Sequence, residues 1–259
     1  ALILSQLEPH HAAGIIGQTR AANIPALYLG NGAGGFEEAA RAYGIDRLTM
    51  PMGSNFGDLD NDGYLDFFLG TGDPNYETLL PNVMYRNVGG KRFVNVTYPG
   101  GFGHLAKGHA ISFADIDNDG DQDIFQQLGG FYLDDAYFNA LYENPGFGGH
   151  WLAIKLVGTE SNRAAIGARI RIEVMEGGQR RSIYRRIGSG SSFGANPLRA
   201  EIGLGEAARV DLLEIYWPTS GRTQSFRDLA ADRFIRITEG DDRIEALNPG
   251  SFRIGGGSR

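Results

Sequence analysis

Cysteine is absent from this 259-residue chain, which excludes a disulfide framework and thiol chemistry. No apolar run approaches the roughly 18–20 residues that cross a bilayer as a helix. Positive charge is in deficit, because 24 Lys and Arg face 31 Asp and Glu and the net charge is −7. An acidic balance of this kind argues against nucleic acid as the main partner.

Glycine is the residue in excess, with 39 of 259 positions, about twice its usual share. No collagen-like G-x-y period accompanies it, so the glycines indicate many tight turns. Hydrophobic residues make up 42% of the chain, which is enough for a core. We therefore predict an all-β protein of short strands, with one large or two medium domains.

The first half contains an internal repeat. Two acidic segments, NFGDLDNDGYLDFFLGTG and SFADIDNDGDQDIFQQLGG, have their first aspartates at Asp58 and Asp115, 57 positions apart. The same spacing separates Tyr28, Tyr85 and Tyr142, each of which lies in an apolar run before a Gly-rich turn. Two motifs with one offset indicate a structural repeat, and a four-stranded propeller blade fits about 57 residues.

The repeats are too few for a closed propeller. Closure needs at least four blades, or roughly 230 residues at this period, but the pattern ends near residue 149. We therefore expect partial β-propeller-type repeats over residues 1–149. Their unpaired sheet edges are expected to pair with other chains.

The second half has no acidic loop and reads as a different β unit. The segments ARIRIEV and RSIYRRI alternate apolar and polar residues, which is typical of half-buried antiparallel strands. Turns such as EGGQ and WPTSGR separate the strands. We predict a β-sandwich or small barrel domain over residues 150–242, followed by a C-terminal extension over residues 243–259.

The acidic loops predict two calcium sites. Both have the form D-x-D-x-D-G-x-x-D, and so many carboxylates in nine residues repel one another unless a cation binds. Hard oxygen ligands at this density suit Ca²⁺, whereas an EF-hand would need Glu where Leu69 and Gln126 stand. The alternative is an acidic, solvated turn. The expected ligands are the side chains of Asp58, Asp60, Asp62, Asp66, Asp115, Asp117, Asp119 and Asp123 and the backbone carbonyls of Tyr64 and Asp121.

These motifs carry a family resemblance. The acidic loops with their following strands resemble FG-GAP/VCBS repeats, the integrin-like calcium-binding propeller repeats. The segments IGSGSSFGANPLRAEIGLG and VDLLEIYWPTSGRTQSFRDLAADRFIRITEG resemble the ASPIC/UnbV domain. The resemblance implies a secreted protein, as in cartilage acidic protein relatives and many bacterial surface proteins. The resemblance implies no catalytic reaction for the ASPIC/UnbV-like domain.

The expected function is that of an extracellular, calcium-binding adhesion or structural protein. We expect it to assemble with copies of itself or with other β-protein chains, as a polymer or filament subunit, or to bind a glycan or a cell-surface protein. We expect neither nucleic acid nor a membrane span. The alternative is a carbohydrate-binding module or a carbohydrate-active enzyme on a propeller scaffold. Catalysis is the weaker expectation because every dense carboxylate cluster lies in a calcium loop.

Overall fold

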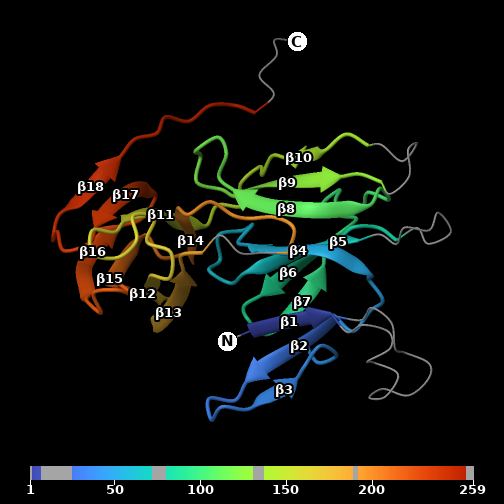
Figure 1. Ribbon diagram of the computed structural model, residues 1–259, viewed down its shortest axis with the longest axis horizontal. Helices are drawn as coiled ribbons and strands as arrows, with labels where there is room; N and C mark the ends of the chain where they lie inside the picture. The colour runs from blue at the N-terminus through green and yellow to red at the C-terminus, as the bar shows by residue number, and fades with distance from the viewer. Residues whose placement is uncertain (1, 7–24, 72–79, 131–136, 189–191, 255–259) are drawn as a thin grey trace.

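The computed structural model describes residues 2–6, 25–71, 80–130, 137–188 and 192–254. Within these ranges the regular secondary structure consists of β-strands, and the sheets lie in a propeller-like arrangement (Figure 1). None of the described segments forms a helix long and apolar enough to cross a membrane. The prediction of an all-β chain is confirmed.

Three antiparallel sheets make up the first half (Figure 1). The first contains β1 (Leu2–Gln6), β2 (Pro25–Gly30) and β3 (Phe36–Glu38). The second contains β4 (Pro51–Gly57), β5 (Asp66–Thr71), β6 (Val83–Val88) and β7 (Arg92–Asn95). The third contains β8 (Gly108–Ala114), β9 (Asp123–Leu128) and β10 (Ala140–Tyr142). The repeated tyrosines lie on the equivalent strands β2, β6 and β10.

The third sheet lacks a counterpart of β7, and the period of 57 residues shows where the equivalent segment lies. Residues 57 positions after β7 belong to β11 (His150–Val157), which pairs with β14 and β17 in another sheet. The segment that would complete the third sheet is thus the first strand of the C-terminal half. Among the described residues, no strand pairs with the outer side of β10.

Strand β5 is buried on both faces, which explains why its sequence DFFLGT shows no alternation. Phe67 and Leu69 pack in one core cluster with residues of the first sheet, such as Leu27. Phe68 packs in a second cluster with Ile111 and Phe113 of β8. A middle sheet that is covered on both sides is expected of stacked propeller blades.

The second half contains two four-stranded sheets that share one hydrophobic core. One has the order β14 (Ala200–Gly205), β11, β17 (Arg233–Thr238) and β18 (Ile244–Leu247). The other has the order β13 (Gln179–Arg186), β12 (Arg169–Glu176), β15 (Arg209–Tyr216) and β16 (Thr223–Ala230). The predicted alternation appears in β12, where Ile170, Ile172 and Val174 are buried in this core.

The structure does not show the separate sandwich or barrel domain that the sequence predicted. The C-terminal sheets are instead bonded to the repeats by backbone and side chains. The backbone of Ser192 pairs with that of Ser54, and the Asn196 amide donates to the Phe56 carbonyl at 2.7 Å. The Gly205 N–H donates to the Asn61 carbonyl at 2.8 Å. These bonds join the second half to the side of the repeats that carries the acidic loops.

Candidate metal centres

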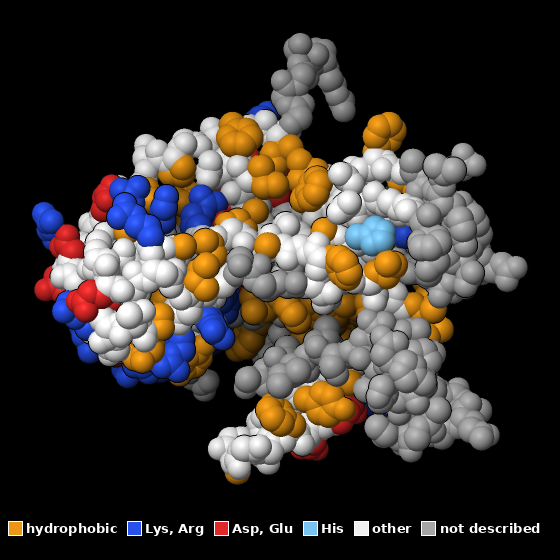
Figure 2. Space-filling model, viewed as in Figure 1, with side chains coloured by type: hydrophobic (Ala, Val, Ile, Leu, Met, Phe, Trp, Pro, Cys, Tyr) orange, Lys and Arg blue, Asp and Glu red, His pale blue; other side chains and the backbone are white. Residues whose placement is uncertain are grey.

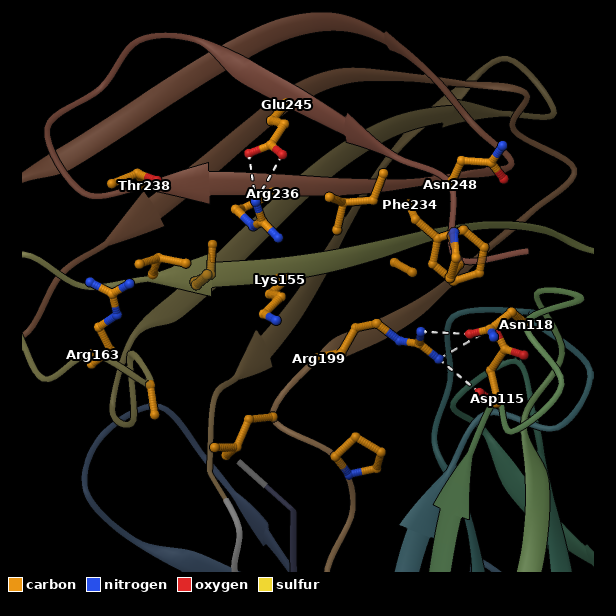
Figure 3. A pocket seen from close by; sticks show the side chains of 18 of the residues that line it. Asp115, Asn118, Lys155, Arg163, Arg199, Phe234, Arg236, Thr238, Glu245 and Asn248 are labelled. Carbon is orange, nitrogen blue, oxygen red and sulfur yellow. Dashed lines mark hydrogen bonds and ion pairs between the residues drawn. The ribbon is translucent and has the colours of Figure 1, made fainter. Parts of the chain in front are cut away.

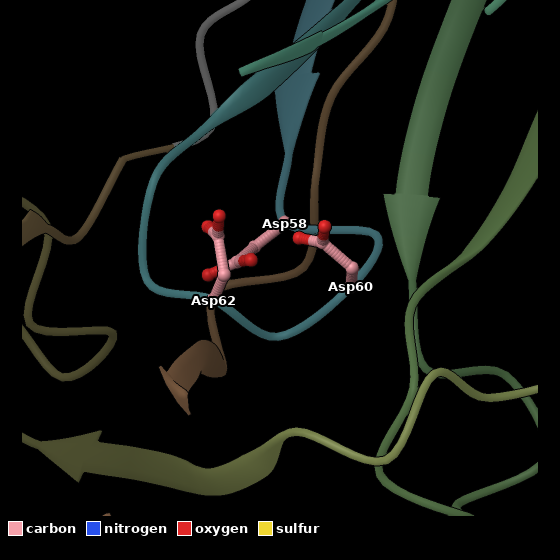
Figure 4. Close-up of side chains that lie close together, drawn as sticks. All are labelled: Asp58, Asp60 and Asp62. Atoms are coloured by element: carbon pink, nitrogen blue, oxygen red, sulfur yellow. The ribbon is translucent and has the colours of Figure 1, made fainter. Parts of the chain in front are cut away.

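The first acidic loop connects β4 to β5 and gathers three carboxylates (Figure 4). One carboxylate oxygen from each of Asp58, Asp60 and Asp62 lies within 4.8 Å of the others. The loop turns through Asn61 and Gly63, both in the left-handed region with φ of 53° and 87°. Because Ca²⁺–oxygen distances are about 2.3–2.6 Å, oxygens this close can bind one ion together.

The second acidic loop connects β8 to β9 and repeats this geometry. Asp115, Asp117 and Asp119 place one oxygen each within 4.8 Å of one another. Asn118 and Gly120 take the left-handed conformations, with φ of 59° and 102°. Each loop therefore presents a triad of aspartates that could bind a metal ion.

The last aspartate of each motif is bonded to the backbone. The two oxygens of Asp66 accept the N–H groups of Leu59 and Asn87, at 2.9 and 2.7 Å. Asp123 accepts those of Ile116 and Asn144, at 3.0 and 2.8 Å. Both residues close their loops in this way, and their role as metal ligands stays a prediction.

Asn87 and Asn144, 57 positions apart, complete this network, although neither belongs to the acidic motif from which the site was predicted. The Asn87 side chain donates to the Leu65 carbonyl at 3.1 Å, and the Asn144 side chain donates to the Gln122 carbonyl at 3.0 Å. The sequence did hold a signal for them, because both asparagines end equivalent segments, MYRN and LYEN, that are 57 positions apart.

Tyr64 and Asp121 occupy the seventh position of each loop. Their backbone N–H groups donate to Asp62 and Asp119, at 2.8 and 3.0 Å. The Asp121 carboxylate accepts a bond from the Asn61 side chain at 2.7 Å, which links the two loops. That their carbonyls bind a metal stays a prediction.

The donor set fits a hard cation. Within the part of the chain that the structure describes, one buried carboxylate oxygen each of Asp58, Asp60, Asp115 and Asp117 has no hydrogen-bond partner, although a buried polar atom is normally paired. The pKa of Asp58 is raised to about 7, mainly by burial, which Arg185 opposes and to which the neighbouring carboxylates of Asp62 and Asp60 add. Burial, and then Glu201, raises the pKa of Asp115 to about 7. A divalent cation would favour the charged form of both groups.

The C-terminal half supplies arginines to both loops, and Arg181 of β13 donates to the Asp62 carbonyl of the first loop at 2.6 Å. Arg185 of β13 lies 3.1 Å from Asp58 Oδ2 and also donates to the Gly63 carbonyl. Arg199 lies 3.6 Å from Asp115 Oδ2 and donates to the Asp115 carbonyl at 2.8 Å. These contacts offset part of the negative charge of the triads. No sequence pattern pointed to them, because more than 80 residues separate the partners.

Gly120 supports the second loop against the C-terminal half, and its replacement tests this packing. A Cβ atom at Gly120 would lie 2.0 Å from the Trp151 ring, in addition to the strain of its positive φ. We expect Gly120→Ala to lower the free energy of unfolding by about 3 kcal/mol, from overpacking and backbone strain together. The control is Gly148→Ala, where φ is 82° and no atom lies within 4 Å. Chemical denaturation measures both, and equal losses would contradict the predicted clash.

Comparisons with known proteins agree with this organisation. The FG-GAP-like repeat family matches residues 15–69, which include the first acidic loop. The ASPIC and UnbV family matches residues 158–244, which cover most of the two C-terminal sheets. A search of curated proteins found no match. The second acidic loop lies outside both matched ranges, but its geometry repeats the first. The chain therefore carries an FG-GAP-like repeat followed by an ASPIC and UnbV domain.

Proposed function

We propose that this chain is an extracellular β-protein that binds two calcium ions and assembles with other chains in adhesion or in a larger structure. The two aspartate triads with unpartnered buried oxygens support the calcium sites. Millimolar extracellular calcium would occupy even sites with dissociation constants of about 10⁻⁴ M. As sequence units, we propose repeats over residues 1–149, the ASPIC and UnbV unit over 150–242, and an extension over 243–259, which begins with the sheet strand β18.

The calcium would stabilise the loops. Each triad lies between two strands of one blade and faces an arginine of the C-terminal half. An ion there would hold both the blade and the attached sheets in place. We propose binding rather than catalysis, because the two dense carboxylate clusters found among the described residues are the proposed calcium sites.

The third sheet carries the observation that favours assembly. Its edge strand β10 has an open side among the described residues, and Leu141 on β10 lies directly opposite Phe125 on β9. Both side chains are exposed, by 43% and 40%, and Phe138 next to them is 96% exposed. An open strand edge beside exposed apolar side chains is a common site of pairing with another chain. We propose that a β-strand of another copy or of a partner chain pairs with β10.

Light scattering tests the assembly. We expect a mass above that of one chain in millimolar calcium, and a smaller mass after chelation with EGTA. Leu141→Glu and Phe125→Glu should each lower the mass in calcium, because the charge would be buried at the contact. Tyr184→Glu is the matched control, since Tyr184 is 64% exposed on β13 of a different sheet. A monomer in calcium at all concentrations would contradict the proposal.

A further inference from the structure

A cavity of about 1220 Å³ lies over the C-terminal sheet on the face that points away from its core (Figure 3). Its floor includes alternate residues of β11 and β17, such as Lys155 and Arg236, and the core residue Leu156 also lines it. One wall is the loop that contains Arg163. The opposite wall includes Asp115 and Asn118 of the second acidic loop.

Positive charge dominates the floor of this cavity. Lys155 and Arg236 are direct neighbours on the paired strands β11 and β17, and like charges in this position destabilise a sheet. Glu245 neutralises Arg236 at 2.8 Å. Among the described residues, no carboxylate forms an ion pair with Lys155 or Arg163, which are both exposed. Two cations thus remain for an anionic ligand. Figure 2 shows further Lys and Arg side chains over the C-terminal half, on the left of the view.

The wall next to the second acidic loop is held by Arg199. This side chain donates to Asn118 Oδ1 at 3.0 Å and to the Asp115 carbonyl at 2.8 Å, and it pairs with Glu201 at 2.8 Å. In Figure 3 its guanidinium points into the loop, whereas Lys155 points into the open space between Arg199 and Arg236. Arg199 therefore shapes the cavity, and Lys155 and Arg163 are the groups that face a ligand.

The type of ligand follows from which groups are available. Strand β17 pairs with β11 on one side and with β18 on the other, and β11 pairs with β14 as far as Ile154, so most main-chain groups of the floor are already bonded and few are left for a peptide. The cavity as a whole offers two cations, Lys155 and Arg163, and neutral polar side chains, Thr238 and Asn248. Cations bind carboxylates or sulfates, and hydroxyl and amide groups bind sugar hydroxyls. We propose that this cavity binds a segment of an acidic saccharide, with Lys155 and Arg163 as the anion-binding residues.

Titration calorimetry in millimolar calcium tests the proposal, with a hexamer of galacturonic acid as the probe and a hexamer of galactose as its neutral counterpart. We expect binding of the acidic hexamer and none of the neutral one. Lys155→Ala and Arg163→Ala should each weaken binding about tenfold, because each removes a charge-assisted hydrogen bond. Arg227→Ala, an exposed arginine on β16 of the other sheet, should leave it unchanged.

Three results would overturn the proposal. One is that the Lys155→Ala, Arg163→Ala double variant binds the acidic hexamer as tightly as the original chain while melting at the same temperature. Another is that the neutral hexamer binds equally well. The third is that a hexamer of glutamate binds as tightly, with the same dependence on Lys155, since the cavity would then recognise an acidic peptide. These measurements are independent of the assembly state, because they read ligand binding and not mass.

Discussion

Chelation of calcium with EGTA is expected to lower the melting temperature of this protein by about 10–20 °C. A ligand at a hundred times its dissociation constant stabilises the folded state by about 2.7 kcal/mol, so two saturated sites contribute about 5 kcal/mol. In a chain of this size each kcal/mol shifts the melting temperature by about 2–4 °C. The two aspartate triads are the physical basis, since within the described residues one buried oxygen each of Asp58, Asp60 and Asp117 has no hydrogen-bond partner. Differential scanning calorimetry with and without calcium makes the measurement.

Substitutions in one loop at a time measure how much each calcium site contributes to the rise in melting temperature. Asp60→Asn and Asp117→Asn each remove one charge from one triad, so each should reduce the calcium-induced rise in melting temperature by about half. Asp242→Asn is the matched control, because Asp242 is exposed in the turn after β17. For each variant we compare the melting temperature in calcium with that in EGTA, because this difference cancels the direct effect of the substitution on stability. Equal melting temperatures in EGTA and in calcium would refute the calcium sites.

Glu239→Gln is expected to lower the free energy of unfolding by about 3 kcal/mol at pH 7. The Glu239 carboxylate is 3% exposed, and it holds the loop before β12 against the end of β17. One oxygen accepts the N–H groups of Thr159, Glu160 and Ser161, at 2.9, 2.9 and 2.7 Å. The other accepts the hydroxyls of Ser161 and Ser220, at 2.9 and 2.6 Å. A glutamine amide would present N–H groups to these donors.

The pH dependence gives this prediction a second readout. Burial alone would raise the pKa of Glu239, but the hydrogen bonds from Ser220, Ser161 and Thr159 lower it to about 2, against an ordinary 4.5. A carboxyl whose pKa falls on folding stabilises the protein above pH 4.5, and this contribution is lost as the pH falls from 4.5 through 2. The difference in the free energy of unfolding between the original chain and Glu239→Gln should therefore become smaller as the pH falls from 4.5 through 2.

Urea unfolding at pH 7, 4 and 2.5 measures the difference, with Glu206→Gln, an exposed glutamate, as the control. The acidic loops titrate in both proteins, so their contribution cancels when the free energy of unfolding of the variant is subtracted from that of the original chain. If Glu239→Gln lies within about 0.5 kcal/mol of the original chain at pH 7, the range of an ordinary surface substitution, the role assigned to Glu239 is wrong.

Short sequence patterns correctly predicted those features that depend only on residues close together in the chain. The triads lie within five residues of one loop each, and their carboxylates come together as the motif indicates. The alternation of Ile170, Ile172 and Val174 correctly predicted a strand with one buried face. The spacing of 57 residues correctly predicted equivalent strands, because stacked sheets repeat one pattern of burial and turns.

The sequence by itself thus determined the all-β class, the repeat and the two acidic loops, since each depends on neighbours within one loop or strand. Only the tertiary structure decided that the second half is joined to the repeats, that β11 leaves the third sheet incomplete, and that Arg185 and Arg199 face the triads. It also placed Lys155 and Arg163 in one cavity. These features depend on contacts between residues far apart in the chain, which composition and spacing do not encode.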